Sequence, residues 1–194
     1  MAIRSRPIIT GFNMQVIDTH IDAVKIIQPT IFKDPRGFFL ETYHAQKLNE
    51  LLGLQDLVFV QDNHSMSTQG VLRGLHYQQE HTQGKLVRVT HGNVFDVCVD
   101  VRKDSPTLGQ WVGIELSSEN FKQLWIPPGF AHGFYVLSET AEFQYKCTDF
   151  YHPQSEISIR YDDPILDIQW PLVNQPELSK KDTDGMSFNT APKI

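Results

Sequence analysis

Residues 85–101, KLVRVTHGNVFDVCVDV, decide the fold class of this chain. The first six, KLVRVT, read as one β-strand, and the last eight alternate with the period of two that a strand requires. This alternation separates two faces, one with Phe95, Val97, Val99 and Val101 and one with Asp96, Cys98 and Asp100. The intervening His91-Gly92-Asn93 is short enough for a tight turn. We therefore predict two β-strands joined by a tight connection.

Similar strand-like runs recur along the chain, at 23–28, 58–63, 110–116, 122–127, 133–137, 142–150 and 157–162. Turn sequences such as 34–37 (DPRG) and 127–129 (PPG) separate them at short intervals, which is typical of an antiparallel sandwich or small barrel. Helix is scarce: only 45–54 places leucines on one stripe, and Gly53 is suited to end that helix. The tail after residue 174 is polar, and we expect it to cross the surface.

Composition limits the function classes. The 194 residues suit one domain, and the net charge of −6 argues against a nucleic-acid-binding surface. No apolar run approaches the ~20 residues that span a bilayer, and residues 1–12 lack the apolar core of a secretory signal. Cys98 and Cys147 lie in strand-like runs, so we expect two buried thiols rather than a disulfide. We predict a cytoplasmic protein that binds neither nucleic acid nor membrane.

Chemically reactive residues interrupt the hydrophobic pattern of residues 70–89, GVLRGLHYQQEHTQGKLVRV. His76 is a natural general base, and an ammonium such as Lys85 can stabilise a developing oxyanion. Guanidinium groups such as Arg73 and Arg88 suit a diphosphate, although we expect Arg88 to form a structural ion pair or hydrogen bond rather than a ligand contact. Strict alternation places Arg73 and His76 on opposite faces, and a bulge at Gly74 is the feature that would bring them together.

A second motif, PPGFAH (127–132), resembles a turn of the cupin superfamily of small barrels. Metal-binding cupins usually pair this turn with a His-x-His hairpin and a glutamate. This chain has His76-Tyr77-Gln78 instead, and an amide is a poor partner for a transition metal beside imidazole. We therefore expect no metal in the pocket, and chemistry by side chains alone.

Nine motifs together resemble the dTDP-4-dehydrorhamnose 3,5-epimerase family, whose members are cupin-fold enzymes that use no metal. They are DPRGFFLE (34–41), VQDNHS (60–65), GVLRGLHYQ (70–78), QGKLVRV (83–89), FDVCVDVRKDSPTLGQW (95–111), IPPGFAHGFYVLS (126–138), YKCTDFY (145–151), DDPILDIQWP (162–171) and LSKKD (178–182). The resemblance implies an all-β, cupin-type jelly-roll or β-sandwich barrel with a few short helices. It also implies inversion of C3 and C5 of a dTDP-4-keto-6-deoxy sugar without any cofactor.

The resemblance also assigns roles to residues. His76 is the base, Asp182 orients it, Lys85 stabilises the enolate, and Tyr145 returns a proton from the opposite face. The implied substrate-binding residues are Arg36, Glu41, Gln61, Asn63, Arg73, His132, Tyr151, Glu156 and Lys181. Tyr151 is the residue expected to stack on thymine.

Family members form homodimers that exchange N-terminal strands, so this resemblance implies that some of these residues serve the neighbouring subunit. The relatives begin near Met14. We therefore interpret residues 1–13 as an N-terminal extension and residues 14–194 as one cupin-like domain that includes the C-terminal tail.

Other functions remain to be separated from this one. An enzyme that inverts only C3 or only C5 keeps the same base, so solvent deuterium exchange at each carbon distinguishes the two. A ketoisomerase is disfavoured, because the hairpin lacks a second histidine. A non-catalytic sugar-nucleotide-binding cupin needs no acid–base pair, whereas this chain has His76 and Tyr145. If the protein is instead a metal-dependent oxygenase or isomerase, elemental analysis should find tightly bound metal.

Overall fold

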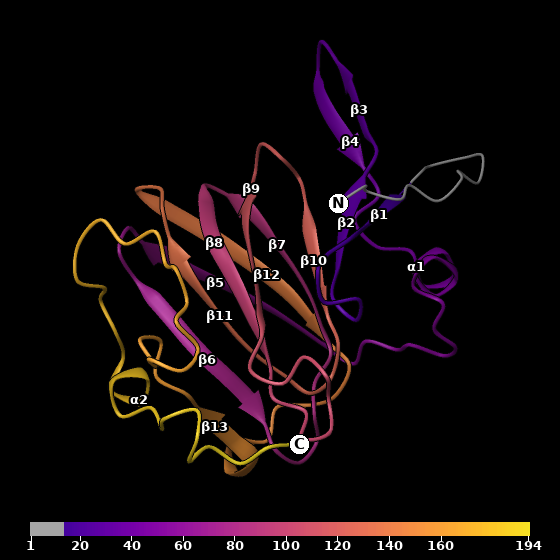
Figure 1. Ribbon diagram of the computed structural model, residues 1–194. Helices are drawn as coiled ribbons and strands as arrows, with labels where there is room; N and C mark the ends of the chain where they lie inside the picture. The colour runs from indigo at the N-terminus through magenta and orange to yellow at the C-terminus, as the bar shows by residue number, and fades with distance from the viewer. Residues whose placement is uncertain (1–13) are drawn as a thin grey trace.

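The computed structural model describes residues 14–194, and the predicted extension, residues 1–13, lies outside them. Two antiparallel sheets face each other (Figure 1). The first contains, in spatial order, β1 (Met14–Asp18), β2 (Lys25–Pro29), β10 (Gln123–Ile126), β7 (Lys85–His91), β12 (Thr140–Cys147) and β5 (Gln61–Thr68). The second contains β13 (Glu156–Ser158), β6 (Leu72–Gln78), β11 (Phe130–Val136), β8 (Asn93–Asp100) and β9 (Trp111–Ser117). The predicted all-β sandwich is confirmed.

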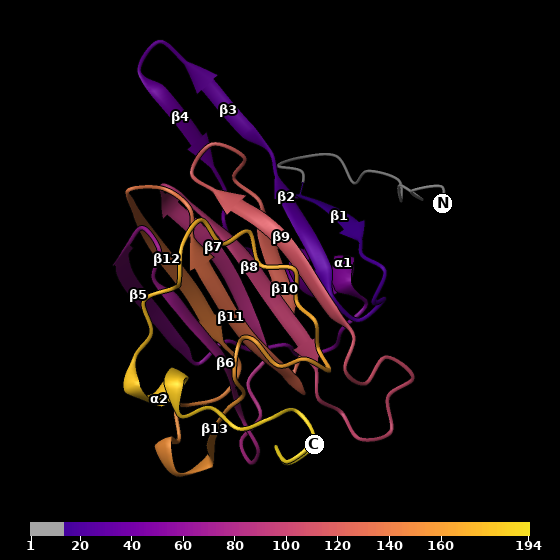
Figure 2. The same ribbon diagram turned by 60° about the vertical axis from the view of Figure 1, so that its left-hand side comes forward.

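The main core lies between the sheets. Val87 and Val89 of β7 and Phe143 of β12 pack there against Phe134 of β11. The polar and apolar faces predicted for β8 are both buried, since a second cluster covers the outer face of its sheet. This cluster joins Val97, Val99 and Val101 to Leu166, Phe188 and Ala191 of the C-terminal segment. Figure 2 shows this segment crossing the five-stranded sheet.

Helices are short, as predicted. Helix α1 (Ala45–Leu52) buries Leu48 beside the six-stranded sheet, and Gly53 ends it with a left-handed φ of 66°. The sequence did not suggest His44 as the residue that caps its first turn, where the imidazole accepts from the Lys47 backbone N–H. The remaining helical segments are η1 (Pro153–Ser155) and α2 (Lys180–Thr183).

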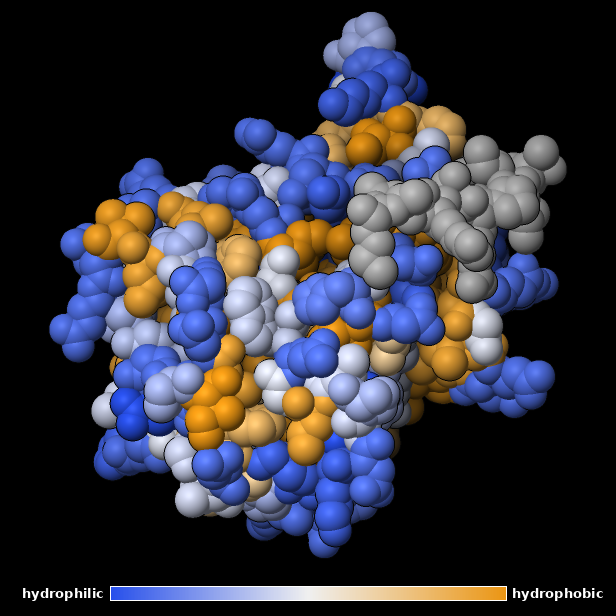
Figure 3. All heavy atoms as spheres, in the orientation of Figure 1, coloured by the Kyte–Doolittle hydropathy of each residue, from blue (hydrophilic) through white to orange (hydrophobic). Residues whose placement is uncertain are grey.

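A hairpin of β3 (Ile31–Asp34) and β4 (Gly37–Leu40) projects from the body of the molecule (Figures 1 and 2). Its tip is polar: the Arg36 guanidinium contacts the Asp34 carboxylate at 2.6 Å. Below the tip, hydrophobic residues reach the surface (Figure 3), and Phe38 and Phe39 are each 59% exposed. Such an exposed aromatic pair on a projecting arm is typical of an interaction surface.

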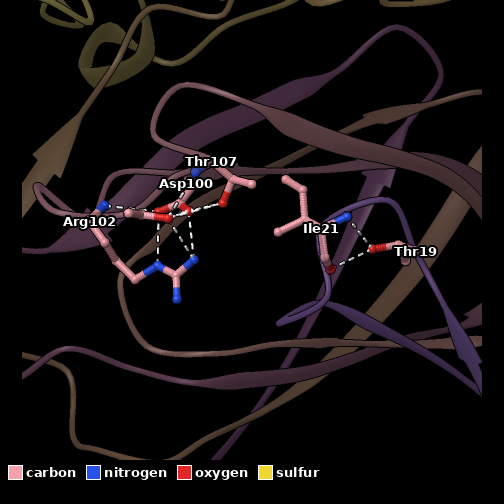
Figure 4. Close-up of polar contacts among 6 residues, drawn as sticks. Thr19, Ile21, Asp100, Arg102 and Thr107 are labelled. Carbon is pink, nitrogen blue, oxygen red and sulfur yellow. Dashed lines mark hydrogen bonds and ion pairs between the residues drawn. The ribbon is translucent and has the colours of Figure 1, made fainter.

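The loop after β8 is held by one buried carboxylate, that of Asp100 (Figure 4). Asp100 accepts hydrogen bonds from the backbone N–H and guanidinium of Arg102 and from the hydroxyls of Ser105 and Thr107. Burial alone would raise the pKa of Asp100, but these donors outweigh it and lower the pKa to about 2.

In the described residues, no helix has the length and apolar character needed to cross a membrane.

Candidate active site

A cavity of about 520 Å³ lies between the two sheets, and it is mostly lined by polar residues. Of the residues predicted for the site, it collects His76, Asp182, Lys85, Tyr145, Gln61, Asn63, Arg73, His132, Tyr151, Glu156 and Lys181. These residues come from both sheets and from the C-terminal segment. A larger hollow of about 690 Å³ beside α1 is lined mainly by apolar residues and contains none of them.

Strand β6 is irregular at Gly74, and this irregularity brings Arg73 and His76 into one cavity. The register between β6 and β11 shifts between the pairs that involve His132 and Phe134. Gly74 has φ +114°, and a Cβ on it would lie 2.5 Å from the Cα of Gly133. Only glycine suits this close approach of two strands. The bulge predicted from alternation is therefore present.

His76 and Asp182 form a hydrogen-bonded pair. His76 Nε2 lies 2.5 Å from Asp182 Oδ1, and the hydroxyl of Ser179 donates to Asp182 Oδ2 at 2.6 Å. The backbone N–H of Gly74 also donates to Oδ1. Burial works to raise the pKa of Asp182, but the hydrogen bonds from His76 and Ser179 outweigh it and lower this pKa. The carboxylate is therefore ionised at neutral pH and fixes the imidazole in one orientation.

Tyr145 lies on the opposite wall from His76, because β12 belongs to the six-stranded sheet and β6 to the five-stranded sheet. Its ring packs beside that of Phe143 at a centroid distance of 6.0 Å. Burial is the main cause that raises the pKa of the Tyr145 phenol. The phenol therefore keeps its proton at neutral pH and can act as an acid.

Lys85 begins strand β7 and is buried at 9% exposure, opposite Cys147 in the neighbouring strand. Within residues 14–194, no hydrogen bond involves its ammonium group. Burial lowers the pKa of Lys85, although Cys147, Glu156 and Asp96 oppose this effect. A buried cation aimed at a cavity is well suited to bind negative charge on a ligand.

A polar network forms one rim of the cavity. The Lys181 ammonium contacts Glu156 Oε1 at 2.8 Å, and the Tyr151 hydroxyl donates to Glu156 Oε2 at 2.9 Å. Burial works to raise the pKa of Glu156, but the bonds from Lys181 and Tyr151 outweigh it and lower this pKa. Gln61 accepts from the Tyr151 backbone N–H and donates to Asn63. This rim is half-open and rich in hydrogen-bonding groups.

His132 follows the Pro-Gly turn and lies at the base of the cavity. Its Nε2 atom is 2.9 Å from Asp96 Oδ2, and both side chains are buried. Asp96 Oδ1 has no hydrogen-bond partner among the described residues. Nearby on β6, Arg73 Nε donates to the hydroxyl of Ser67, which holds the guanidinium at the wall.

Three residues considered for the site, Arg36, Glu41 and Arg88, do not line this cavity. Arg36 lies at the exposed tip of the β3–β4 hairpin, and Glu41 pairs with Lys47, so neither reaches the cavity of its own chain. Arg88, which we expected to be a structural residue although its guanidinium suits a diphosphate, donates to Gln144 and does not line this cavity. Strand alternation explains its position, since Val87 and Val89 take the inward face.

The sequence interpretation missed several lining residues, among them Ser65, Gln83, Cys147 and Ser179. A signal for some of them was present. Ser65 continues the alternate positions of Gln61 and Asn63 along β5, and Cys147 lies two residues after Tyr145 on β12. Ser179 gave no such signal, because its place depends on the fold of the tail.

The comparisons with known proteins agree with this geometry. The family model described as dTDP-4-dehydrorhamnose 3,5-epimerase matches residues 18–190. The dTDP-4-dehydrorhamnose 3,5-epimerase of Salmonella typhimurium is 58% identical over 170 residues, which cover 87% of this chain and 92% of that protein. The enzyme of the same name from Neisseria gonorrhoeae is 53% identical over 93% of this chain, which spans 54% of that longer protein.

A solved structure of dTDP-6-deoxy-D-glucose-3,5-epimerase from Legionella pneumophila, in complex with dTDP-4-keto-L-rhamnose, has a TM-score of 0.91 to this chain. Its sequence is 59% identical, and the match covers 93% of this chain and 95% of that one. The fold, the sequence and the family match give one result: this chain belongs to the dTDP-4-dehydrorhamnose 3,5-epimerase family.

Proposed function

We propose that this protein inverts C3 and C5 of dTDP-4-keto-6-deoxyglucose to give dTDP-4-keto-L-rhamnose. The observation that carries the proposal is the hydrogen-bonded His76–Asp182 pair on one wall of a cavity and the protonated Tyr145 on the facing wall. A base and an acid on opposite sides of a sugar ring are the minimum requirement for inversion at carbon.

The C4 ketone makes the hydrogens on C3 and C5 acidic. His76 removes the proton from one of these carbons, and the electron pair moves to the C4 oxygen to form an enolate. Tyr145 then donates its proton to the other face of the same carbon, which restores the ketone and inverts the centre. Exchange with solvent then removes the proton from His76 and reprotonates Tyr145, after which the second carbon follows by the same steps. The carbons undergo no net change of oxidation state, so the reaction needs no electron acceptor.

Lys85 is the residue that we assign to the enolate oxygen. Its ammonium group is buried, and its lowered pKa reflects the cost of an uncompensated charge in that place. Negative charge on the C4 oxygen offsets this cost in the transition state. The interaction is therefore stronger with the enolate than with the neutral ketone, as catalysis requires.

We assign the remaining polar and aromatic groups of the cavity to the nucleotide. Arg73 and Lys181 supply positive charge for the diphosphate, while the half-exposed ring of Tyr151 offers a surface for thymine. Gln61 and Asn63, bonded to each other, supply amide groups at the same rim.

Solvent exchange tests the proposal. In D₂O, ¹H NMR should show deuterium entering the sugar at both C3 and C5, together with the product of double inversion. Exchange at one carbon only would indicate an enzyme that inverts a single centre. A His76→Ala variant should still bind dTDP while losing exchange, whereas a protein that only binds sugar nucleotides shows no exchange even as wild type.

We also propose that the protein is a homodimer in which the N-terminal strands are exchanged. The projecting β3–β4 hairpin with exposed Phe38 and Phe39 supports this arrangement, as does the position of Arg36 and Glu41 away from their own cavity. Exchange would carry these two residues to the partner's cavity.

We also propose a cytoplasmic location for the protein. Its two cysteines, Cys98 and Cys147, are buried free thiols, which is typical of proteins in a reducing compartment.

Mixing two inactive variants tests the exchange. In a heterodimer of Arg36→Ala and His76→Ala chains, one cavity has both defects and the other has neither, provided that Arg36 acts across the dimer. Random mixing should then restore about a quarter of the wild-type activity, since half of the dimers are mixed and each has one intact site. No recovery is expected if Arg36 serves its own chain.

A further inference from the structure

Outside the catalytic cavity, two loops bring together His81, Asp149 and His152. One ligand atom from each lies within 4.8 Å of the others, which makes this the group in residues 14–194 that could hold a metal ion. His81 Nδ1 is 3.6 Å from Asp149 Oδ2, and the two imidazole rings are stacked with centroids 3.8 Å apart. His81 belongs to the loop between β6 and β7, whereas the other two follow β12.

Gln78 holds these two loops in place. Its buried amide donates to the backbone carbonyls of His81 and Phe150, at 2.7 and 3.1 Å, and accepts from the backbone N–H of His152 at 2.7 Å. One buried side chain therefore fixes both segments that carry the three candidate ligands. Gln78 occupies the position that the cupin resemblance associated with a metal ligand, but it does not line the catalytic cavity.

The Asp149 carboxylate is oriented as well. Its Oδ1 atom accepts the backbone N–H of Phe150 at 2.7 Å, and its Oδ2 atom faces His81. Gln83 in turn donates to the Asp149 backbone carbonyl at 2.9 Å. Bonds of this kind, which orient a ligating residue, commonly surround metal sites in proteins.

We propose that His81, Asp149 and His152 form a binding site for a divalent transition-metal ion of the Zn²⁺, Co²⁺ or Ni²⁺ class. Two imidazoles and one carboxylate match the ligands that these ions prefer, and solvent supplies the remaining position because the side chains are half-exposed. The site is separate from the His76–Asp182 pair and does not depend on the function proposed for it.

A small rearrangement suffices for binding. Ligand atoms in a tetrahedral zinc site lie about 3.3 Å apart, given metal–ligand bonds of ~2.0–2.1 Å. The stacked rings cannot both direct a nitrogen at one ion, so at least one ring must turn about its Cβ–Cγ bond. The His81 side chain is 50% exposed and has room to do so, while Gln78 keeps the backbone of both loops fixed.

Isothermal titration of the untagged, EDTA-treated protein with Zn²⁺ tests the site. We expect one ion per chain with a micromolar dissociation constant, and binding at least tenfold weaker in His81→Asn, His152→Asn and Asp149→Asn. Asparagine tolerates the left-handed backbone of His81, at φ 56°, so that this variant keeps its fold. Absorption of bound Co²⁺ in the visible range reports the same site by its ligand geometry.

Two control variants make the result specific. His64 is a half-exposed histidine 3.3 Å from Glu142 and belongs to no three-residue group, so His64→Asn should bind Zn²⁺ like wild type. His76→Asn, which disables the catalytic pair, should also bind normally. The proposal is overturned if wild type does not bind, if the three ligand variants bind like wild type, or if a control variant abolishes binding.

Discussion

Replacing Asp182 by asparagine separates the charge of this side chain from its hydrogen bonds. In the wild type, Oδ1 faces His76 Nε2 at 2.5 Å, while Oδ2 accepts from Ser179 at 2.6 Å. An asparagine amide has the same shape: its oxygen can accept from the imidazole and its NH₂ group can donate to the serine hydroxyl. The buried groups stay paired, and only the negative charge is removed.

That charge stabilises the imidazolium that forms when His76 takes a proton from the sugar. The charge centres of such a pair lie about 4 Å apart, which corresponds to about 4 kcal/mol at an effective dielectric constant of 20. Asp182 is 3% exposed and His76 is 22% exposed, so water screens the pair only weakly. Since about 1.4 kcal/mol is tenfold in rate, kcat should fall about 1,000-fold in Asp182→Asn. KM should change little, because the sugar carbons are uncharged in the ground state.

Deuterium incorporation at C3 and C5, followed by ¹H NMR in D₂O, measures this loss directly. Asp184→Asn is the matched control, since Asp184 follows the same short helix and pairs with Lys180 at the surface without contact to His76. It should exchange at the wild-type rate. A loss of less than tenfold in Asp182→Asn, or an equal loss in Asp184→Asn, would refute the assignment of Asp182 as the ionic partner of the base.

Three further predictions concern the opposite wall, the loop after β8 and the β6 irregularity. Tyr145→Phe should form epimerised product at least 100-fold more slowly while His76 still exchanges protons on its own face, as NMR of the same sample can show. Asp100→Asn should lose about 2 kcal/mol of stability at pH 7, measured by urea unfolding. Because the pKa of Asp100 is lowered to about 2 in the folded protein, its contribution is full above about pH 4 and fades as the pH falls toward 2, so the difference from wild type must shrink there. Gly74→Ala should unfold at a much lower temperature than Gly70→Ala, which shares a positive φ but has no atom within 4 Å of its added Cβ; equal losses contradict the packing argument.

The sequence predicted the strands whose two faces differ in hydrophobicity and misplaced β5, which lines the cavity with polar residues. Residues 85–101 form two strands with a tight connection, as expected, because one face of each strand enters a core. The two strands do not pair with each other, since β7 belongs to the six-stranded sheet and β8 to the five-stranded sheet. Strand β5 was placed at 58–63 but spans Gln61–Thr68. Its residues are polar on both faces because one face borders the cavity, and hydrophobic alternation cannot detect such a strand. The strand predicted at 157–162 is short for a different reason: it ends at Ser158, after which the chain pairs with the tail.

Residue chemistry predicted the parts of the site that residues 70–89 carry, whereas the remaining parts depend on contacts between distant segments. These residues read as a β-hairpin, but β6 and β7 belong to different sheets and face each other across the cavity instead of pairing. His76, Lys85 and Arg73 follow from the pattern of residues 70–89 alone. Asp182 is 106 residues from His76 along the chain, and only the resemblance to a family assigned it. Arg36 was assigned in the same way, and it lies at the tip of a projecting hairpin, away from the cavity of its own chain.

The C-terminal tail was expected to cross the surface, and it does so, but it is also what completes the catalytic pair. Before α2, the backbone of Glu177 exchanges hydrogen bonds with Gly70 and Leu72 at the start of β6. After α2, Met186 bonds to Ser158 and Arg160 at the end of β13. The first attachment precedes His76 along β6, and the second includes Ser158, the residue of β13 that pairs with His76, so the four-residue helix between the attachments stays close to the imidazole. Backbone bonds on both sides of Asp182 along the chain therefore keep it beside His76, where its hydrogen bonds to His76 and Ser179 fix the carboxylate. The polarity of the tail reflects its outer face, whereas its path is set by the sheet beneath it.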